Sequence, residues 1–288
     1  MAVIDNEYKV LIGGSDFSDI IAMEEGYFWR LTSFSAESAT GQDLKGYMHV
    51  PIRGERVQLT FKAPPYITQE RLYDLVNALE MGSKGQREVE IQYNDPAFGQ
   101  ISHSFYCTNV PWIKEKLPNY PHHYASGVQI QLASTRFMKR KVIDDAPRLP
   151  INQVVDSEYL FKLNGKDFSD IVAIDGFQGQ GIEQSLSSQT GLTLDGKFHI
   201  PVIGSRTQHT IKAIEYMEVG RFRQLAKELG FGKTGERQHS VTTKDLVYGQ
   251  TTQNFYCTEI SGYRVKLPNY PYHYMREVQF QQAMKQFY

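Results

Sequence analysis

The sequence predicts a mainly β protein of the α+β class, built from two tandem copies of an antiparallel β-sandwich or β-barrel domain with one short helix in each copy. Three observations predict this fold: an internal duplication, several runs of alternating apolar and polar residues, and one helical periodicity per copy. The length of 288 residues also suits two domains of roughly 100–200 residues each.

The duplication is the most informative feature of the sequence. An ungapped shift of 150 residues aligns most of the first half with the second, and near each start the shift is 151. A repeat of this length is a copied domain, because solenoid units have periods of about 20–50 residues. We therefore expect a first domain over residues 1–135, a linker or bridging strand over 136–157, and a second domain over 158–288. The recurring segments include 16–20 at 167–171, 105–108 at 255–258, and 116–121 at 266–271.

Alternating apolar residues predict the strands of each copy. Met48, Val50 and Ile52 alternate with polar residues, and the alternation resumes from Val57 onward. Residues 53–56 lie between these runs and contain a glycine, so we expect a turn there and a hairpin across it. Further alternations predict strands near 89–93, from 105 onward, and at 128–132, with counterparts in the second copy.

One short amphipathic helix is expected in each copy. Thr68 has the side chain of an N-cap, and apolar residues follow it at helical spacing until Gly82. The second copy repeats this pattern and ends at Gly230. The apolar positions are Leu72, Leu75, Val76 and Leu79 in the first copy, and Phe222, Leu225, Ala226 and Leu229 in the second.

Composition and charge limit the classes of function. The chain carries 31 Lys and Arg against 32 Asp and Glu, so its net charge of −1 gives no field that would attract nucleic acid or an anionic membrane. A hydrophobic content of 41% is enough for a packed core and argues against disorder. The first seven residues lack the features of a secretory signal, and no apolar run of about 20 residues exists. We therefore expect a protein made inside the cell without a membrane-spanning segment.

The histidines do not form the pattern of a metal site. His49 and His199 occupy equivalent positions, but neither belongs to a spacing that would bring two or three ligands together. His122 and His123 are adjacent, and adjacent side chains of an extended segment point in opposite directions. We expect no metal and no cofactor.

The cysteines and paired carboxylates also lack the surroundings of a catalytic centre. Cys107 and Cys257 fill equivalent strand positions, where no base accompanies them and a disulfide between the two domains is geometrically unfavourable. The carboxylate pairs follow a glycine turn without further oxygen ligands at loop spacing, so we expect solvated acids there. These pairs are Asp16 with Asp19 and Asp167 with Asp170. We expect no catalytic residues and no enzyme activity.

A loop rich in proline and tyrosine recurs in both copies with the pattern Lys-Leu-Pro-Asn-Tyr-Pro-x-His-Tyr. Proline fixes φ, and the rings can pack against whatever the loop crosses. The loop is interpreted either as an interface loop or as a connection across one end of a sheet. Its candidate interface residues are Pro118, Tyr120, Tyr124, Pro268, Tyr270 and Tyr274.

The order of these elements resembles the tail-tube fold of bacteriophage tail proteins, as in tube proteins, distal tail proteins and baseplate hub proteins. Segments 39–79 and 87–132 resemble small tail proteins of phages and prophages of Gram-positive bacteria. In the second copy Gly220 stands where Glu70 does, and 245–249 replaces the Asn-Asp-Pro turn. The residues that carry the resemblance are Thr40, Gly41, Gly46, Met48, Thr68, Glu70, Leu72, Leu75 and 93–99.

This resemblance implies a structural role in a ring. Six tail-tube domains surround a channel for DNA, and their hairpins pair with those of neighbouring subunits, which satisfies otherwise open sheet edges. A chain with two such domains builds the ring as a trimer. The hairpin residues expected at subunit or lumen surfaces are Gly46, His49, Arg53, Arg56, Gly196, His199 and Arg206.

The resemblance also implies partners and a location. We expect a homo-oligomeric hub or adaptor at the distal end of the tail, in contact with tail tube, tape-measure and tail-tip proteins. DNA would pass through its lumen only transiently. The protein would be assembled in the host cytoplasm and reside in the virion.

Three rival interpretations remain open. A distal tail or tail tube protein would place six chains, hence twelve domains, in each ring. A binding module would use the tyrosine-rich loops to hold host glycan on coplanar rings. A peptidoglycan hydrolase would need acids arranged as a site, and none is repeated in both copies.

Overall fold

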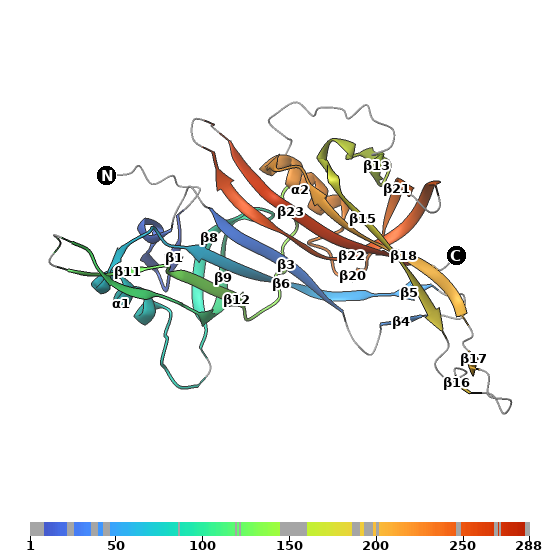
Figure 1. The fold of residues 1–288 in the computed structure, drawn as a ribbon. Coiled ribbons are helices and arrows are strands. Elements are labelled where there is room, and N and C mark those ends of the chain that lie inside the picture. The colour runs from blue at the N-terminus through green and yellow to red at the C-terminus, as the bar shows by residue number, and fades with distance from the viewer. Residues whose placement is uncertain are drawn as a thin grey trace.

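The computed structural model describes residues 9–21, 26–35, 40–42, 47–85, 87–118, 120, 122–144, 160–185, 191–192, 198–199, 202–245, 249–267, 270 and 272–285. In these residues the fold is mainly β with two α-helices, one in each repeat, and every paired strand is antiparallel (Figure 1). The predicted fold class is confirmed at this level.

The first repeat contains twelve strands and one α-helix among the described residues. They are β1 (Leu11–Ile12), β2 (Ser15–Asp16), β3 (Tyr27–Ser35), β4 (Gly41–Gln42), β5 (Met48–His49), β6 (Pro51–Lys62), β7 (Ile67–Thr68), α1 (Gln69–Ala78), β8 (Val89–Asp95), β9 (Gly99–Asn109), β10 (Ile113–Lys116), β11 (His123–Ser126) and β12 (Gln129–Ser134).

The second repeat follows the same order, with several strands longer than their counterparts. They are β13 (Phe161–Leu163), β14 (Lys166–Asp167), β15 (Val172–Ser185), β16 (Gly191–Leu192), β17 (Phe198–His199), β18 (Val202–Ala213), β19 (Tyr216–Glu218), α2 (Val219–Glu228), β20 (Gly235–Glu236), β21 (His239–Asp245), β22 (Gly249–Lys266) and β23 (His273–Met284).

The two repeats share one continuous sheet. In the first repeat the strand order is β3-β6-β12-β9-β8-β1-β2, and in the second the equivalent strands follow as β15-β18-β23-β22-β21-β13-β14. The repeats join where β3 of the first pairs with β22 of the second (Figure 1). The two halves predicted from the duplication are therefore connected by main-chain hydrogen bonds in addition to the segment between them.

The predicted hairpin turn at residues 53–56 is wrong. These residues lie inside β6, which continues from Pro51 to Lys62, and the equivalent residues of the second repeat lie inside β18. Gly54 serves close packing, because a Cβ at this position would lie 2.5 Å from Phe137 Cγ. Glu55 is buried and extended rather than exposed in a turn. Met48 and His49 of β5 pair instead with β4.

The helices form as their sequence predicts. In α1 the Thr68 side chain accepts a hydrogen bond from Arg71 N at 3.2 Å, and in α2 Glu218 takes the same role toward Arg221 N at 3.3 Å. After the C-cap Leu229 of α2, Gly230 has φ +87°, a conformation that glycine adopts without strain. In α1 the equivalent residue after the C-cap Leu79 is Glu80 with φ +53°, so the helix ends before the predicted stop at Gly82.

At three of the equivalent core positions, an apolar residue of the first repeat is replaced by a histidine or a glutamine in the second. Leu59, Val89 and Leu132 are buried in the first repeat, whereas His209, His239 and Gln282 are buried at the matching places in the second. His239 Nε2 lies 2.9 Å from Gln282 Oε1, and Gln282 Nε2 lies 3.4 Å from His209 Nδ1. Burial lowers the pKa of His239 from 6.5 to about 4.

This polar core predicts a stability that depends on pH. Because the folded protein holds His239 neutral, the histidine binds a proton more readily when the chain unfolds, so stability falls as the pH drops from 6.5 to about 4. The loss is about 3 kcal/mol at 1.36 kcal/mol per pKa unit. The triple variant His209→Leu/His239→Val/Gln282→Leu, which copies the first repeat, is expected to lose this component of the slope. Denaturant titrations from pH 7 to pH 4 measure it, and an unchanged slope would contradict the assignment.

Candidate assembly interface

The contact between the two repeats is built on strands β3 and β22. Their register runs from Thr32 opposite Glu259 to Tyr27 opposite Arg264. Trp29 lies opposite Gly262 in this register and is fully buried. Its indole packs edge-on against Phe222 of α2 at 5.6 Å between ring centroids. Trp29 therefore contributes a fully buried aromatic contact between the repeats.

Trp29 is also held by a buried carboxylate. Its Nε1 donates to Asp95 Oδ2 at 2.7 Å, and Tyr93 Oη donates to the same oxygen at 2.7 Å. The main-chain N–H groups of Ala97 and Phe98 donate to Asp95 Oδ1 at 2.8 and 3.0 Å. Burial raises the pKa of Asp95, and these hydrogen bonds act against that rise. The loop after β8 is therefore fixed directly behind the interface tryptophan.

A buried ion pair forms the second main contact between the repeats. Arg237 Nη2 lies 2.5 Å from Glu55 Oε1, and each side chain is 2% exposed. The Gly232 N–H also donates to Glu55 at 3.1 Å, and Arg237 Nη1 donates to Ser33 Oγ at 2.7 Å. Burial raises the pKa of Glu55 above its usual value, and the guanidinium of Arg237 offsets part of that rise. Ser33 and Glu55 are themselves cross-strand neighbours in the β3–β6 pair.

Helix α2 is covered at this contact, whereas α1 is not. Arg223 Nε donates to Pro96 O of the first repeat at 2.9 Å. Of the residues of α1, Leu75 is fully buried, while Tyr73 is 67% exposed. The buried residues of α2 are Val219, Gly220, Arg221, Phe222, Arg223, Leu225 and Ala226. The difference arises because the first repeat lies against α2.

The described part of the predicted linker, 136–144, bridges the two repeats. Met138 N donates to Glu55 O at 2.7 Å, and Ile143 N donates to Ala97 O at 3.0 Å. Asp144 pairs with Lys227 at the end of α2, at 2.6 Å. This segment therefore contacts both repeats, and its described residues form no strand, only an isolated bridge between Met138 and Glu55.

Within the described residues, each repeat has one strand edge that is unpaired, although the equivalent edge of the other repeat is paired at the interface. Strand β15, the equivalent of β3, pairs only with β18 within the described residues. The stretch 106–116, the equivalent of the β22 segment, pairs with β12 and β11 on one side, and no described strand covers the other side. Unpaired strand edges of this kind are templates for pairing with another chain.

An apolar groove lies beside the second of these open edges. It has a volume of about 330 Å³ and is lined by residues of α1 and of the strands that follow. Trp112, which is 54% exposed, forms part of its wall. The lining residues include Leu72, Tyr73, Val76, Trp112 and Tyr124. An exposed aromatic group of this kind on a strand edge is typical of an interaction surface.

The structure separates the residues predicted for a hairpin surface. His49 is exposed, and its Nδ1 lies 3.5 Å from Glu236 Oε1 of the second repeat. Arg53 is exposed on β6, and Arg206 is half-buried on β18 opposite Ile182. His199 pairs through its backbone with Gly191. Gly46, Gly196 and Pro268 lie outside the described residues.

Arg56 lies in a basic hollow of the first repeat. Its guanidinium carbon is 5.4 Å from the centroids of both Phe34 and Phe137. The hollow has a volume of about 600 Å³. Arg136, Lys139 and Arg140 also line it, and Arg136 pairs with Glu88 at 2.9 Å. Of the predicted surface residues, Arg56 is therefore the one whose described surroundings are cationic.

The tyrosines of the two predicted interface loops adopt the same geometry. Tyr120 and Tyr124 have ring centroids 6.1 Å apart at 89°, and Tyr270 and Tyr274 have centroids 6.2 Å apart at 90°. Tyr120 and Tyr270 are exposed, and Pro118 is exposed in the turn before Tyr120. Perpendicular rings do not form the coplanar surface that the glycan-binding interpretation expects.

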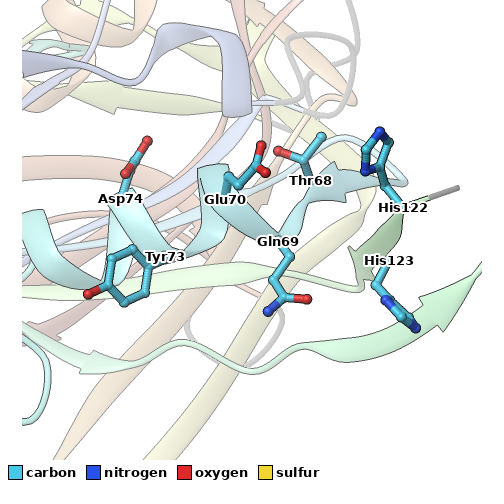
Figure 2. Close-up of a pocket in the computed structure, with 7 residues that line it drawn as sticks. All are labelled: Thr68, Gln69, Glu70, Tyr73, Asp74, His122 and His123. Carbon is cyan, nitrogen blue, oxygen red and sulfur yellow. The ribbon is translucent and has the colours of Figure 1, made fainter.

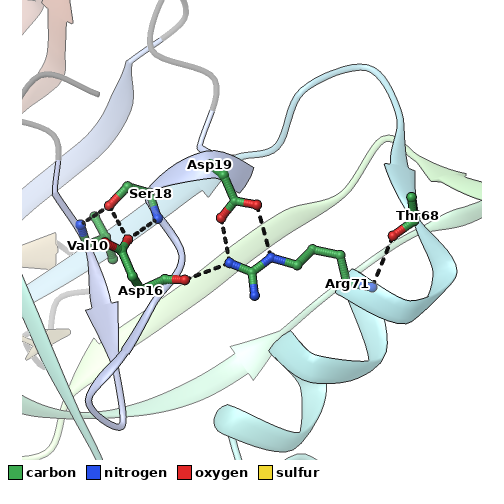
Figure 3. Close-up of polar contacts among 6 residues, drawn as sticks. All are labelled: Val10, Asp16, Ser18, Asp19, Thr68 and Arg71. Atoms are coloured by element: carbon green, nitrogen blue, oxygen red, sulfur yellow. Dashed lines mark hydrogen bonds and ion pairs between the residues drawn. The ribbon is translucent and has the colours of Figure 1, made fainter. Parts of the chain in front are cut away.

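The paired carboxylates tie a turn to the helix of each repeat. Asp19 accepts two hydrogen bonds from the Arg71 guanidinium, at 2.5 and 3.0 Å, and Arg71 also donates to Asp16 O at 2.6 Å (Figure 3). Arg71 stacks on Phe17 at 4.4 Å. Arg221 repeats these contacts with Asp170, Asp167 O and Phe168. Asp19 and Asp170 are therefore ion-paired rather than free in solvent, whereas the exposed side chains of Asp16 and Asp167 accept hydrogen bonds from Ser18 and Ser169 in the same turns.

The adjacent histidines line an open pocket of about 620 Å³ with Glu70, Tyr73 and Asp74. His122 and His123 point to opposite sides of the chain, as predicted from an extended segment (Figure 2). Within the described residues, no group of three or more His, Cys, Asp or Glu side chains is placed to hold a metal ion.

The two cysteines are free and buried in equivalent strands. Burial raises the pKa of Cys107, and it raises the pKa of Cys257 to about 12. Both thiols therefore stay protonated near neutral pH, and neither is an activated nucleophile.

Comparison of the chain with protein-family models, with curated proteins and with solved structures finds no match. Among the described residues, no helix combines the length and apolar character needed to cross a membrane. The interface is therefore interpreted from its own geometry.

Reasoning from the sequence missed the residues that join the repeats, namely Trp29, Gly262, Glu55 and Arg237. A signal for them exists in the aligned repeats. Trp29 aligns with a glycine and Gly262 aligns with a tryptophan, which marks the strongest change of side-chain size between the two copies of this contact.

Proposed function

We propose that the chain is a ring-forming structural subunit of a bacteriophage tail, in which copies associate head to tail. The open edge of β15 on one copy would pair with the open edge of residues 109–114 on the next. The observation that carries this proposal is the β3–β22 contact, in which the equivalent edges of the two repeats are already joined within one chain.

The type of contact supports a closed or growing assembly rather than a simple dimer. The β3–β22 pairing is heterologous, because one edge of a repeat meets a different edge of its neighbour. Each chain still has one edge of each kind available within its described residues. A heterologous contact generates a ring when its rotation closes and a filament when it does not.

The resemblance to tail-tube proteins supports three chains per ring. Three chains carry six repeats, which would match a sixfold tube on one side and a threefold tail tip on the other. In this role the protein is a hub or adaptor in the virion, assembled in the host cytoplasm and in contact with tail tube, tape-measure and tail-tip proteins. The hollow around Arg56 supplies a cationic surface suited to transient contact with DNA.

Native mass spectrometry of the purified full chain tests the ring. The expected particle has three times the chain mass of 33.0 kDa. A particle of six chains would instead support the assignment to a distal tail or tube protein, with twelve repeats in each ring. A monomer at every concentration, or a dimer that does not grow, would contradict ring formation.

Gene order tests the assignment to a tail independently of the ring. A tape-measure gene upstream of the coding sequence is the expected finding. Neighbouring genes that encode no virion protein would contradict the tail assignment and leave the ring measurement standing.

A further inference from the structure

The contact inside the chain defines the register expected between chains. Residues 259–264 of β22 correspond to 109–114, and residues 27–32 of β3 correspond to 177–182, because both pairs of segments align with a shift of 150. The strand pairs confirm this equivalence: Trp29 faces Leu59 in the first repeat, and Gly179 faces His209 in the second. Transferred to two copies, the register places Asn109 opposite Ile182, Trp112 opposite Gly179, and Lys114 opposite Phe177.

The transferred register contains an exchange of a tryptophan and a glycine. Within the chain, Trp29 of β3 lies opposite Gly262 of β22. Between chains, Gly179 of β15 would lie opposite Trp112. Within the chain the tryptophan lies on β3 and the glycine on β22, whereas between chains the glycine would lie on β15 and the tryptophan in 109–114. Each contact would therefore contain one indole and one glycine. Residues directly opposite in an antiparallel pair project to the same face of the sheet, so either strand can supply the ring.

The groove beside α1 is placed to receive this arrangement. Leu72 of α1 is the equivalent of Phe222 of α2, which packs on Trp29 inside the chain. Leu72 lines the groove together with Trp112. Gly179 is exposed in the isolated chain, and it has no side chain that would compete with the indole for space. Strand β15 of a second copy, paired with residues 109–114, would therefore cover Trp112. It would cover the groove beside α1 as β3 covers α2 within the chain.

A second exchange involves the interface carboxylate. In the β3–β6 pair, Ser33 lies opposite Glu55, and Glu55 binds Arg237. In the β15–β18 pair, Glu183 lies opposite Ser205, so the glutamate has moved to the other strand of the same cross-strand pair.

The arginine that this glutamate would meet is Arg87. Arg87 corresponds to Arg237, and each lies near the equivalent cysteine, where its charge lowers the thiol pKa. Within the described residues, the Arg87 guanidinium contacts Met81 Sδ at 3.9 Å and no carboxylate. A neighbouring chain would supply the opposite charge.

The strand that would be covered is incomplete in the isolated chain. β22 runs without interruption from Gly249 to Lys266 beside β3, whereas its counterpart is divided into β9 and β10 around residues 110–112. Pro111 has no N–H and cannot act as a donor in the new pair. The remaining residues of this segment can pair with β15 once a second copy is present.

From these observations we infer that two copies meet through residues 109–114 and 177–182, with Trp112 of one copy opposite Gly179 of the next and Arg87 of one copy paired with Glu183 of the next. The occupant of the α1 groove is a second copy of this chain. This inference rests on the proposed function, because it specifies the register of the contact that closes the ring.

Exchange variants of the full chain test the tryptophan contact. Trp112→Gly is expected to raise the protein concentration needed for assembly by about 30-fold or more, as expected for loss of a central interface tryptophan. Trp112→Gly/Gly179→Trp would recreate the arrangement found inside the chain and is expected to restore much of the assembly. Tyr66→Gly, which removes an exposed ring outside the register and outside the groove lining, serves as the control and is expected to assemble normally.

Charge reversal tests the ion pair in the same way. Arg87→Glu and Glu183→Arg are each expected to weaken assembly by about tenfold or more, and the double variant is expected to recover it. Mass photometry over a concentration series measures the assembled fraction, and circular dichroism of the dissociated chain confirms folding. We expect Trp112→Gly to remain folded, because Trp112 is more than half exposed in the isolated chain. A loss of assembly by a folded variant then reports on the contact between copies.

The outcomes separate this inference from the proposed function. If the wild-type chain assembles and both exchange pairs behave as described, the register is supported. If the wild type assembles while Trp112→Gly and Arg87→Glu assemble equally well, the register is wrong and ring formation stands. If the wild type never assembles, both are overturned.

Discussion

Arg237→Met is expected to destabilise the folded chain by about 3–5 kcal/mol, because it leaves the Glu55 carboxylate buried without its cation. The Gly232 N–H remains as a donor, but one neutral donor does not replace a guanidinium. The free energy of unfolding from denaturant titration measures the loss. Since Glu55 and Arg237 lie on different repeats, a single unfolding transition can also separate into two.

The direction of the pH dependence distinguishes an unpaired charge from lost packing. Burial already raises the pKa of Glu55, and removing Arg237 removes the largest influence that lowers it. The raised pKa means that protonation favours the folded state, so the variant is expected to be most stable below the unfolded value of 4.5 and to weaken as the pH rises above it.

The matched control removes both charges at once. Glu55→Gln/Arg237→Met is expected to be clearly more stable than Arg237→Met alone, because no uncompensated charge is buried. Equal stability of the single and double variants at neutral pH would show that the carboxylate is not the source of the loss.

Trp29→Ala is the second change with a large expected effect, about 3–5 kcal/mol of stability. It removes the ring that packs on Phe222 and leaves Asp95 with one donor fewer. Trp29→Phe is the informative comparison, because it keeps a ring against Phe222 and removes only the Nε1–H donor. We expect this variant to lose about 1–3 kcal/mol. Thermal and denaturant unfolding of both variants measure the difference, and identical losses would show that the apolar contact adds little.

The local elements could be predicted because local chemistry decides them. The Thr68 side chain caps the N-terminus of α1, and Gly230 follows the C-cap of α2 with positive φ. The alternation of Val89, Ile91 and Tyr93 matches the buried face of β8. These signals need only a few neighbouring residues and are therefore visible in the sequence.

The interface could not be predicted in the same way because it depends on residues far apart in the chain. Gly54 suggested a turn, but its lack of a Cβ serves the packing of Phe137 and the extended course of β6. The sequence around Glu55 suggested a turn because the charge partner of Glu55, Arg237, lies 182 residues further along the chain. The alignment of the repeats shows where the two copies differ, but only the register shows that the differences face each other.

The exchanged residues would also give the proposed assembly a means of selecting partners. If β3 met residues 109–114 of another chain, Trp29 and Trp112 would occupy the same space. If β15 met β22, Gly179 and Gly262 would leave that space empty. Specificity often combines a favourable contact with a penalty on the alternative. In the proposed ring, the contact within each chain and the contact between chains would therefore stay distinct.

Electron microscopy of the assembled particle is the most direct measurement of head-to-tail edge pairing. We predict a ring of six similar domains from three chains, with β15 of each chain continuing the sheet of its neighbour along residues 109–114. A particle in which two copies meet by like edges around a twofold axis, or one in which β15 remains uncovered, would contradict it.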